Sequence, residues 1–104
     1  MKKDWLGNPV TTTSETTLAG IDDFIEGFLA YEVKAANILK AADEAPDDCL
    51  ANAYAAMFYM FLESTEAPSL ARPYIEKAEA AASRATPREQ LTTAIVRRWG
   101  RIDR

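Results

Sequence analysis

One stretch of the chain is apolar almost without interruption. Thirteen of the fourteen residues from Cys49 to Leu62 are apolar, and Asn52 is the exception. A helix that is apolar on every side must be covered on every side, either by protein or by lipid. A membrane span needs about 20 such residues, and this run stops at Glu63. We therefore expect a central helix, buried between other helices of an all-α protein.

Helical periodicity surrounds this segment, and no stretch alternates apolar and polar residues for long enough to predict a strand. We predict one helical domain over 14–104, preceded by an extended arm over 1–13 that Trp5 and Leu6 pin to the body. A break near Ala30 is inferred from length, since one helix over 15–45 would span about 45 Å. The predicted helices occupy about 14–30, 32–45, 47–64, 69–85 and 87–100.

Helix starts are marked by capping residues and prolines. Thr86, followed by Pro87 and by Glu89 three residues on, forms a capping box. Asp47 is predicted to cap the central helix. Because proline is tolerated only in the first turn of a helix, Pro73 predicts that the fourth helix begins between residues 69 and 73.

The chain has few of the residue types that most often serve in catalysis and metal binding. Histidine is absent and Cys49 is the single cysteine. Histidine is the commonest general base near neutral pH and the commonest metal ligand, so we expect no catalytic residues, no metal and no cofactor. Cys49 is expected to be a small buried hydrophobe. No apolar segment follows the N-terminal Met-Lys-Lys-Asp-Trp, so we expect a cytoplasmic protein without a signal peptide.

Charge is divided unevenly along the chain. Residues 1–83 hold six basic against fourteen acidic side chains, net −8, whereas residues 84–104 hold six arginines against two acids, net +4. We expect the arginines to be solvated or to pair with the acidic residues of the body. We expect neither nucleic acid nor a membrane as partner, since a short basic stretch is weak evidence for a nucleic-acid-binding surface. The alternative is nucleic-acid binding through Arg97, Arg98, Arg101 and Arg104.

A repeated pattern points to stacked hairpins. Pro46 and Pro87 each follow an alanine-rich helix and each precede a long helix, and they lie 41 residues apart. A helical hairpin that recurs every 34 to 47 residues or so is typical of a solenoid. The segment at 42–48 resembles the end of a tetratricopeptide repeat, although Asn52, Ala55 and Ala56 replace the usual Trp-Leu-Gly of the next helix.

Short motifs in order along the chain carry a closer resemblance. They are Asp4, Gly7, Val10-Thr11-Thr12-Thr13-Ser14, Leu39-Lys40-Ala41-Ala42-Asp43 with Pro46, and Thr86-Pro87-Arg88-Glu89-Gln90-Leu91. In these the chain resembles the N-terminal part of the tetratricopeptide repeat protein 38-like family. The resemblance implies a helical repeat scaffold without established catalytic chemistry, and a longer protein with further hairpins. The Trp-x-x-Gly-Asp turn expected near Trp99 is not matched.

Two sets of residues are candidate contact sites. In a repeat scaffold the first helix of each hairpin lines the concave face, which predicts partner binding by Leu50, Asn52, Met57 and Met60, with Ala53 beside them. The alternative is that these residues fill the core, where Tyr54, Phe58 and Phe61 are expected. On the last helix, Leu91, Ile95 and Trp99 form an apolar stripe that predicts either self-association, as in a homodimer, or packing back on the bundle.

The sequence therefore favours a non-catalytic scaffold that binds a protein or peptide partner. The alternative is a helical bundle that binds or senses a small molecule. Its pocket would lie between helices around Phe58, Tyr59, Phe61 and Tyr74.

Overall fold

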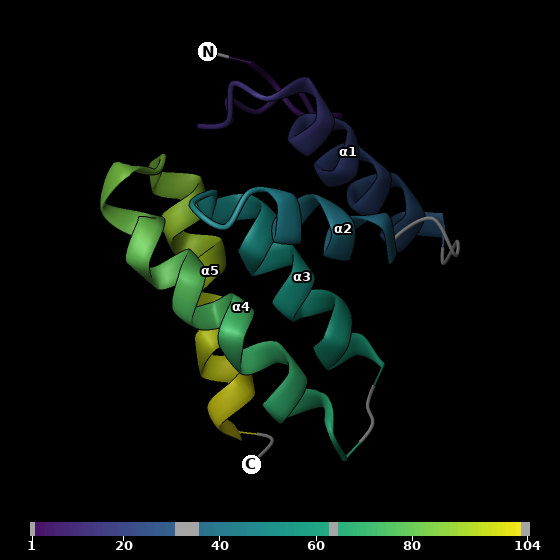
Figure 1. Cartoon of the computed structure of the whole chain (residues 1–104), viewed down its shortest axis with the longest axis vertical. Coiled ribbons are helices and arrows are strands. Elements are labelled where there is room, and N and C mark those ends of the chain that lie inside the picture. The colour runs from purple at the N-terminus through teal and green to yellow at the C-terminus, as the bar shows by residue number, and fades with distance from the viewer. Residues whose placement is uncertain (1, 31–35, 63–64, 103–104) are drawn as a thin grey trace.

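Helices account for most of the chain in the computed structural model, which describes residues 2–30, 36–62 and 65–102 (Figure 1). The described residues contain no strand, so the all-α prediction is confirmed. The elements in order are α1 (Glu15–Ala30), α2 (Asn37–Glu44), α3 (Cys49–Phe61), α4 (Ala67–Ala81), the single 3₁₀ turn η2 (Ala82–Arg84) and α5 (Pro87–Ile102).

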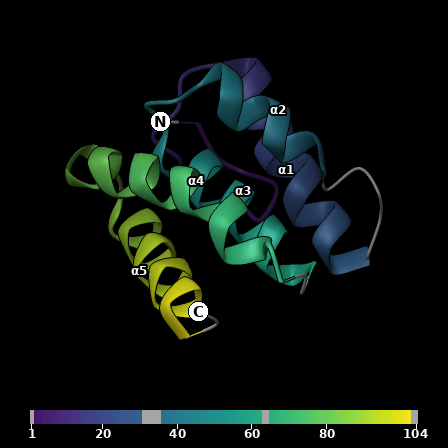
Figure 2. The same cartoon turned by 60° about the horizontal axis from the view of Figure 1, so that its bottom comes forward.

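The apolar segment forms the central helix, as predicted. Helix α3 packs against α1, α2, α4 and α5, and Figures 1 and 2 both show it between the α1–α2 pair and the α4–α5 pair. Every residue from 49 to 56 is buried. Four of these eight are alanines, whose small side chains let neighbouring helices approach α3 from several sides. The helix needs no polar face because protein covers its N-terminal half on all sides.

The N-terminal arm is a small hairpin, and the prediction of an extended arm was wrong. Lys3 and Pro9 form an isolated antiparallel bridge, and Gly7 turns the chain with φ = 85°, a conformation that glycine adopts without steric cost. Trp5 and Leu6 lie at the tip and are 55% and 52% exposed. The Trp5 N–H donates to Asp22 of α1, and Leu6 lies near Phe24, Ile25 and Tyr54. Val10 holds the arm more deeply, because its side chain is fully buried in the core around α1 and α3.

The helix starts follow the capping rules, but the cap of α3 lies one residue later than predicted. The Thr86 hydroxyl accepts a hydrogen bond from the N–H of Glu89, and the Glu89 carboxylate accepts one from the N–H of Thr86, both at 3.2 Å. The predicted capping box is therefore confirmed. The cap of α3 is Asp48, whose carboxylate accepts from the N–H of Ala51 at 2.9 Å, and not the predicted Asp47.

Helix α4 starts earlier than predicted. It begins at Ala67 with Pro68 in its first turn, and Pro73 lies inside it. Burial of Ala67 and Ala71 against Met60 of α3 favours helix in the turn before Pro73. Pro73 is exposed, and so is Ser69, the residue whose carbonyl would have accepted a hydrogen bond from an N–H at position 73.

Two predicted boundaries cannot be compared, because the start of the second helix at 32 and the end of the third at 64 lie outside the described residues. Helix α2 is described from Asn37. It packs against α1 with Ala41 close to Gly20. Among the described helices, none combines the length and hydropathy that crossing a membrane requires.

Candidate functional site

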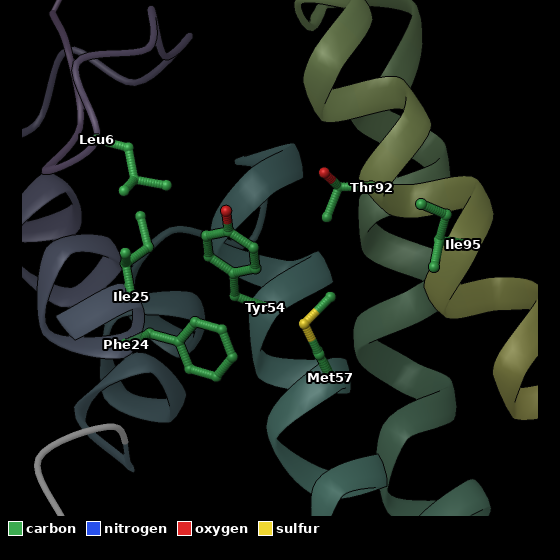
Figure 3. Close-up of a pocket in the computed structure, with 7 residues that line it drawn as sticks. All are labelled: Leu6, Phe24, Ile25, Tyr54, Met57, Thr92 and Ile95. Atoms are coloured by element: carbon green, nitrogen blue, oxygen red, sulfur yellow. The ribbon is translucent and has the colours of Figure 1, made fainter. Parts of the chain in front are cut away.

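An open apolar groove of about 320 Å³ lies between α1, α3 and α5. Figure 3 shows its side chains converging from the arm and α1 on one side and from α5 on the other, with α3 between them. The lining residues are Leu6, Phe24, Ile25, Tyr54, Met57, Thr92 and Ile95.

Helical spacing explains why these residues share one surface. Tyr54 and Met57 are three residues apart on α3, as are Thr92 and Ile95 on α5, and residues at that spacing lie on the same face of a helix. Leu6 reaches the groove because the Gly7 turn brings the tip of the arm over α1 and α3. The surface therefore combines side chains from four segments that are distant in sequence.

An ion pair between the buried Asp4 and the half-buried Arg88 joins the arm to α5 beside Tyr54. The Arg88 guanidinium lies 2.9 Å from the Asp4 carboxylate and donates a hydrogen bond to the Tyr54 hydroxyl at 3.0 Å. The other Asp4 oxygen accepts from the N–H groups of Leu6 and Asn8, each at 3.0 Å. A buried carboxylate is tolerated when it is paired and hydrogen-bonded in this way. Asp4 therefore holds the arm to α5 through Arg88.

The Tyr54 ring forms the floor of the groove although the side chain is almost wholly buried. It stacks on Phe24 with 4.7 Å between ring centroids. Burial raises the pKa of the phenol, and the nearby Arg88 partly opposes that rise. The hydroxyl therefore stays protonated at neutral pH, and it offers no charge to a ligand.

A second link between the arm and α5 passes through Glu89, which is buried. Its carboxylate accepts hydrogen bonds from the N–H of Thr11, at 2.9 Å, and from the Thr11 hydroxyl. The same carboxylate completes the capping box with Thr86. One side chain thus both starts α5 and anchors the arm to it.

Cys49 lies in this buried layer and is shielded. Its sulfur is 3.1 Å from the Thr93 hydroxyl, which itself donates to the Glu89 carbonyl at 2.9 Å. Burial raises the pKa of the thiol, which disfavours the nucleophilic thiolate. The prediction that Cys49 is a small buried residue is confirmed.

Three of the four predicted partner-binding residues are core residues. Leu50, Asn52 and Met60 are at most 2% exposed, so their prediction as a contact surface was wrong. The Asn52 amide instead donates to the carbonyls of Ala45, at 3.1 Å, and Asp48, at 2.7 Å. Those bonds fix the turn between α2 and α3. Met57 is half-buried and lines the groove, so it stays a candidate contact residue.

The predicted self-association stripe divides into two parts. Leu91 and Ile95 are 62% and 54% exposed, which leaves them available to another molecule. Trp99 is half-buried, since its ring packs edge-to-face against Phe61 with centroids 4.7 Å apart. Self-association itself stays a prediction.

The aromatic residues expected to form a small-molecule pocket do not line the groove. Tyr59 packs against both Phe58 and Tyr74, with centroids 5.9 Å apart in each pair. The Tyr74 hydroxyl donates to Asp43 at 2.9 Å. Phe61, expected in the core, is 45% exposed. These rings contact one another and Trp99, and the apolar groove lies elsewhere on α3.

Two arginines near α5 pair with the acidic body, as expected. Arg88 pairs with Asp4, and Arg97 lies 3.4 Å from Glu79 of α4. The side chains of Arg101 and Arg104 lie outside the described residues. Comparison of the chain with family models, with curated proteins and with solved structures gives no match.

Proposed function

We propose that the protein is a non-catalytic interaction module whose groove receives apolar side chains of a protein partner. The observation that carries the proposal is that the polar groups in the groove already have hydrogen-bond partners within the chain. Its lining has only two hydroxyls, and each has an intramolecular partner: Tyr54 accepts from Arg88, and Thr92 donates to the Arg88 carbonyl at 3.0 Å. Small-molecule pockets use a few polar groups to orient the ligand, whereas an amphipathic helix needs chiefly an apolar groove.

The arrangement of helices supports a tetratricopeptide-type scaffold as part of this proposal. Helix α1 packs on α2 and α3 packs on α4, while α3 also packs on α1 and on α5. Stacked hairpins produce such contacts, because each unit packs on its neighbours. In that interpretation α1, α3 and α5 are the first helices of three successive units. The groove lies on those three helices, which is where such scaffolds present their concave face.

A peptide selection tests the proposed function. Random 16-residue peptides displayed on phage are selected against the full chain, and the enriched peptides are synthesised. We expect amphipathic helices with apolar residues at i, i+3 or i+4, and i+7. Ile95→Glu should weaken their binding about tenfold or more, because a carboxylate would enter an apolar contact.

Leu70→Glu is the matched control for that experiment. Leu70 lies on α4, is 43% exposed and does not line the groove, so its substitution should leave peptide affinity unchanged. Peptides that bind equally well to the Ile95→Glu variant would place the binding surface elsewhere. The small-molecule alternative would be favoured if the selection yields no peptide binder while small organic molecules shift the NMR signals of Met57 and Ile95.

A further inference from the structure

We infer that the partner of the groove is a second copy of this chain, bound with twofold symmetry through α5. This inference rests on the proposed function, because it names the occupant of the same groove.

The first argument is shape. Leu91 and Ile95 form an exposed apolar ridge on α5, and Ile95 also lines the groove beside it. One face of the molecule therefore carries both a ridge and a groove. A twofold dimer requires a surface that is complementary to itself. When the α5 ridge of one copy enters the groove of the other, the reverse contact forms at the same time.

The second argument is charge. On the α1 side of the groove, Asp22 accepts a hydrogen bond from the Trp5 N–H at 2.6 Å, next to the tip of the arm. On the α5 side, Arg98 is exposed and lies on the same face as Leu91 and Ile95. The two sides of the groove thus carry opposite charge.

These charges select the occupant. A helix flanked by acids alone is repelled by the α1 side of the groove, and one flanked by bases alone is repelled by the α5 side. In the twofold pair, α5 of one copy lies against α1 of the other, and Arg98 of each copy meets Asp22 of its partner. The face that carries the groove is therefore complementary to itself in charge as well as in shape.

Sedimentation equilibrium of the full chain tests the inference. We expect a dimer whose dissociation constant rises about tenfold or more in Leu91→Glu and in Ile95→Glu, and that weakens with added salt because exposed charges are screened. Leu70→Glu should dimerise like the unsubstituted chain. Because Leu91 and Ile95 are exposed, thermal melts should show that both variants remain folded.

A disulfide experiment tests the symmetry. Cys49 is buried, so an added surface cysteine is the only reactive thiol. Residues near a twofold axis face their own copies, so Leu91→Cys or Ile95→Cys should give a covalent dimer under mild oxidation, and Leu70→Cys should not.

The contrary outcomes separate this inference from the proposed function. A chain that stays monomeric up to about 1 mM, the concentration at which even a weak complex of that affinity forms, overturns the second copy as occupant. So does a dimer that survives both glutamate substitutions. If selected peptides still bind the monomer in an Ile95-dependent way, the proposed function stands without self-association. If they do not, both fail.

Discussion

At the scale of single residues, α1 and α2 approach each other closely at Gly20 and Ala41. A Cβ placed on Gly20 would lie 2.3 Å from the Cβ of Ala41, far inside van der Waals contact. We expect Gly20→Ala to lower the free energy of unfolding by about 1–3 kcal/mol through overpacking, although alanine by itself favours helix. Urea denaturation measures the change.

The control for Gly20→Ala is a second substitution that restores the lost space. Adding Ala41→Gly removes the methyl group that the new Cβ meets, so the double variant should be more stable than Gly20→Ala alone. If the two substitutions simply add, the helices are not in contact at this position.

The carboxyl group of Asp48 makes the stability of the fold depend on pH. Burial raises the pKa of its carboxyl above 3.8, against the opposing hydrogen bond from Ala51, and nearby Glu89 adds to the rise. The folded state therefore binds this proton more tightly than the unfolded state. The resulting stabilisation is complete below pH 3.8 and is lost as the pH rises through the higher folded pKa.

Asp48→Asn removes this titration and keeps a side-chain oxygen for the cap. Relative to the unsubstituted chain, the variant should gain stability as the pH is raised from about 3 to about 7. Unfolding free energies measured across that range check the sign. A difference that stays constant with pH would mean that Asp48 titrates alike in both states.

At the scale of elements, α4 is helical where its sequence disfavours a helix, because packing against α3 outweighs the effect of Pro73. Pro73 lies inside the helix and removes one backbone hydrogen bond, a defect that costs about 3 kcal/mol in an exposed helix. We expect Pro73→Ala to stabilise the protein by about 1–3 kcal/mol, part of the gain being offset by a more flexible unfolded chain. Thermal and urea denaturation both report it.

Pro68 supplies the comparison for this prediction. It lies in the first turn of the same helix, where no intrahelical partner exists for an N–H. Pro68→Ala should therefore change the stability by less than about 0.5 kcal/mol. Equal effects at both prolines would indicate that the chain around Pro73 is not helical in solution.

The helices could largely be predicted from the sequence, because periodicity and caps are local signals. The capping box at Thr86 and Glu89 needs only four residues and was located correctly. The start of α4 was misplaced because the rule for Pro73 is also local, whereas Ala67 and Ala71 gain their burial from α3. Where packing outweighs propensity, a local rule misplaces the boundary.

The groove could not be located from the sequence for a related reason. A helix that is apolar on every side has no polar face to show which side is open, so the surface of α3 was assigned to Leu50 and Met60. The groove opens beside Met57, with the buried Tyr54 ring at its floor, and none of the described helices fills it. Leu6 joins that surface only through the folded arm.

At the scale of the whole molecule, the two links between the arm and α5 bear on how the chain folds. Thr11 and Glu89 are 78 positions apart, and Asp4 and Arg88 are further apart still. Units of a helical array usually need only their neighbours and gain order from any starting point. Here the arm gains its links to Arg88 and Glu89 only after α5 has been made. Pairing over such a distance slows folding, and it makes the first and last segments of the chain gain order together.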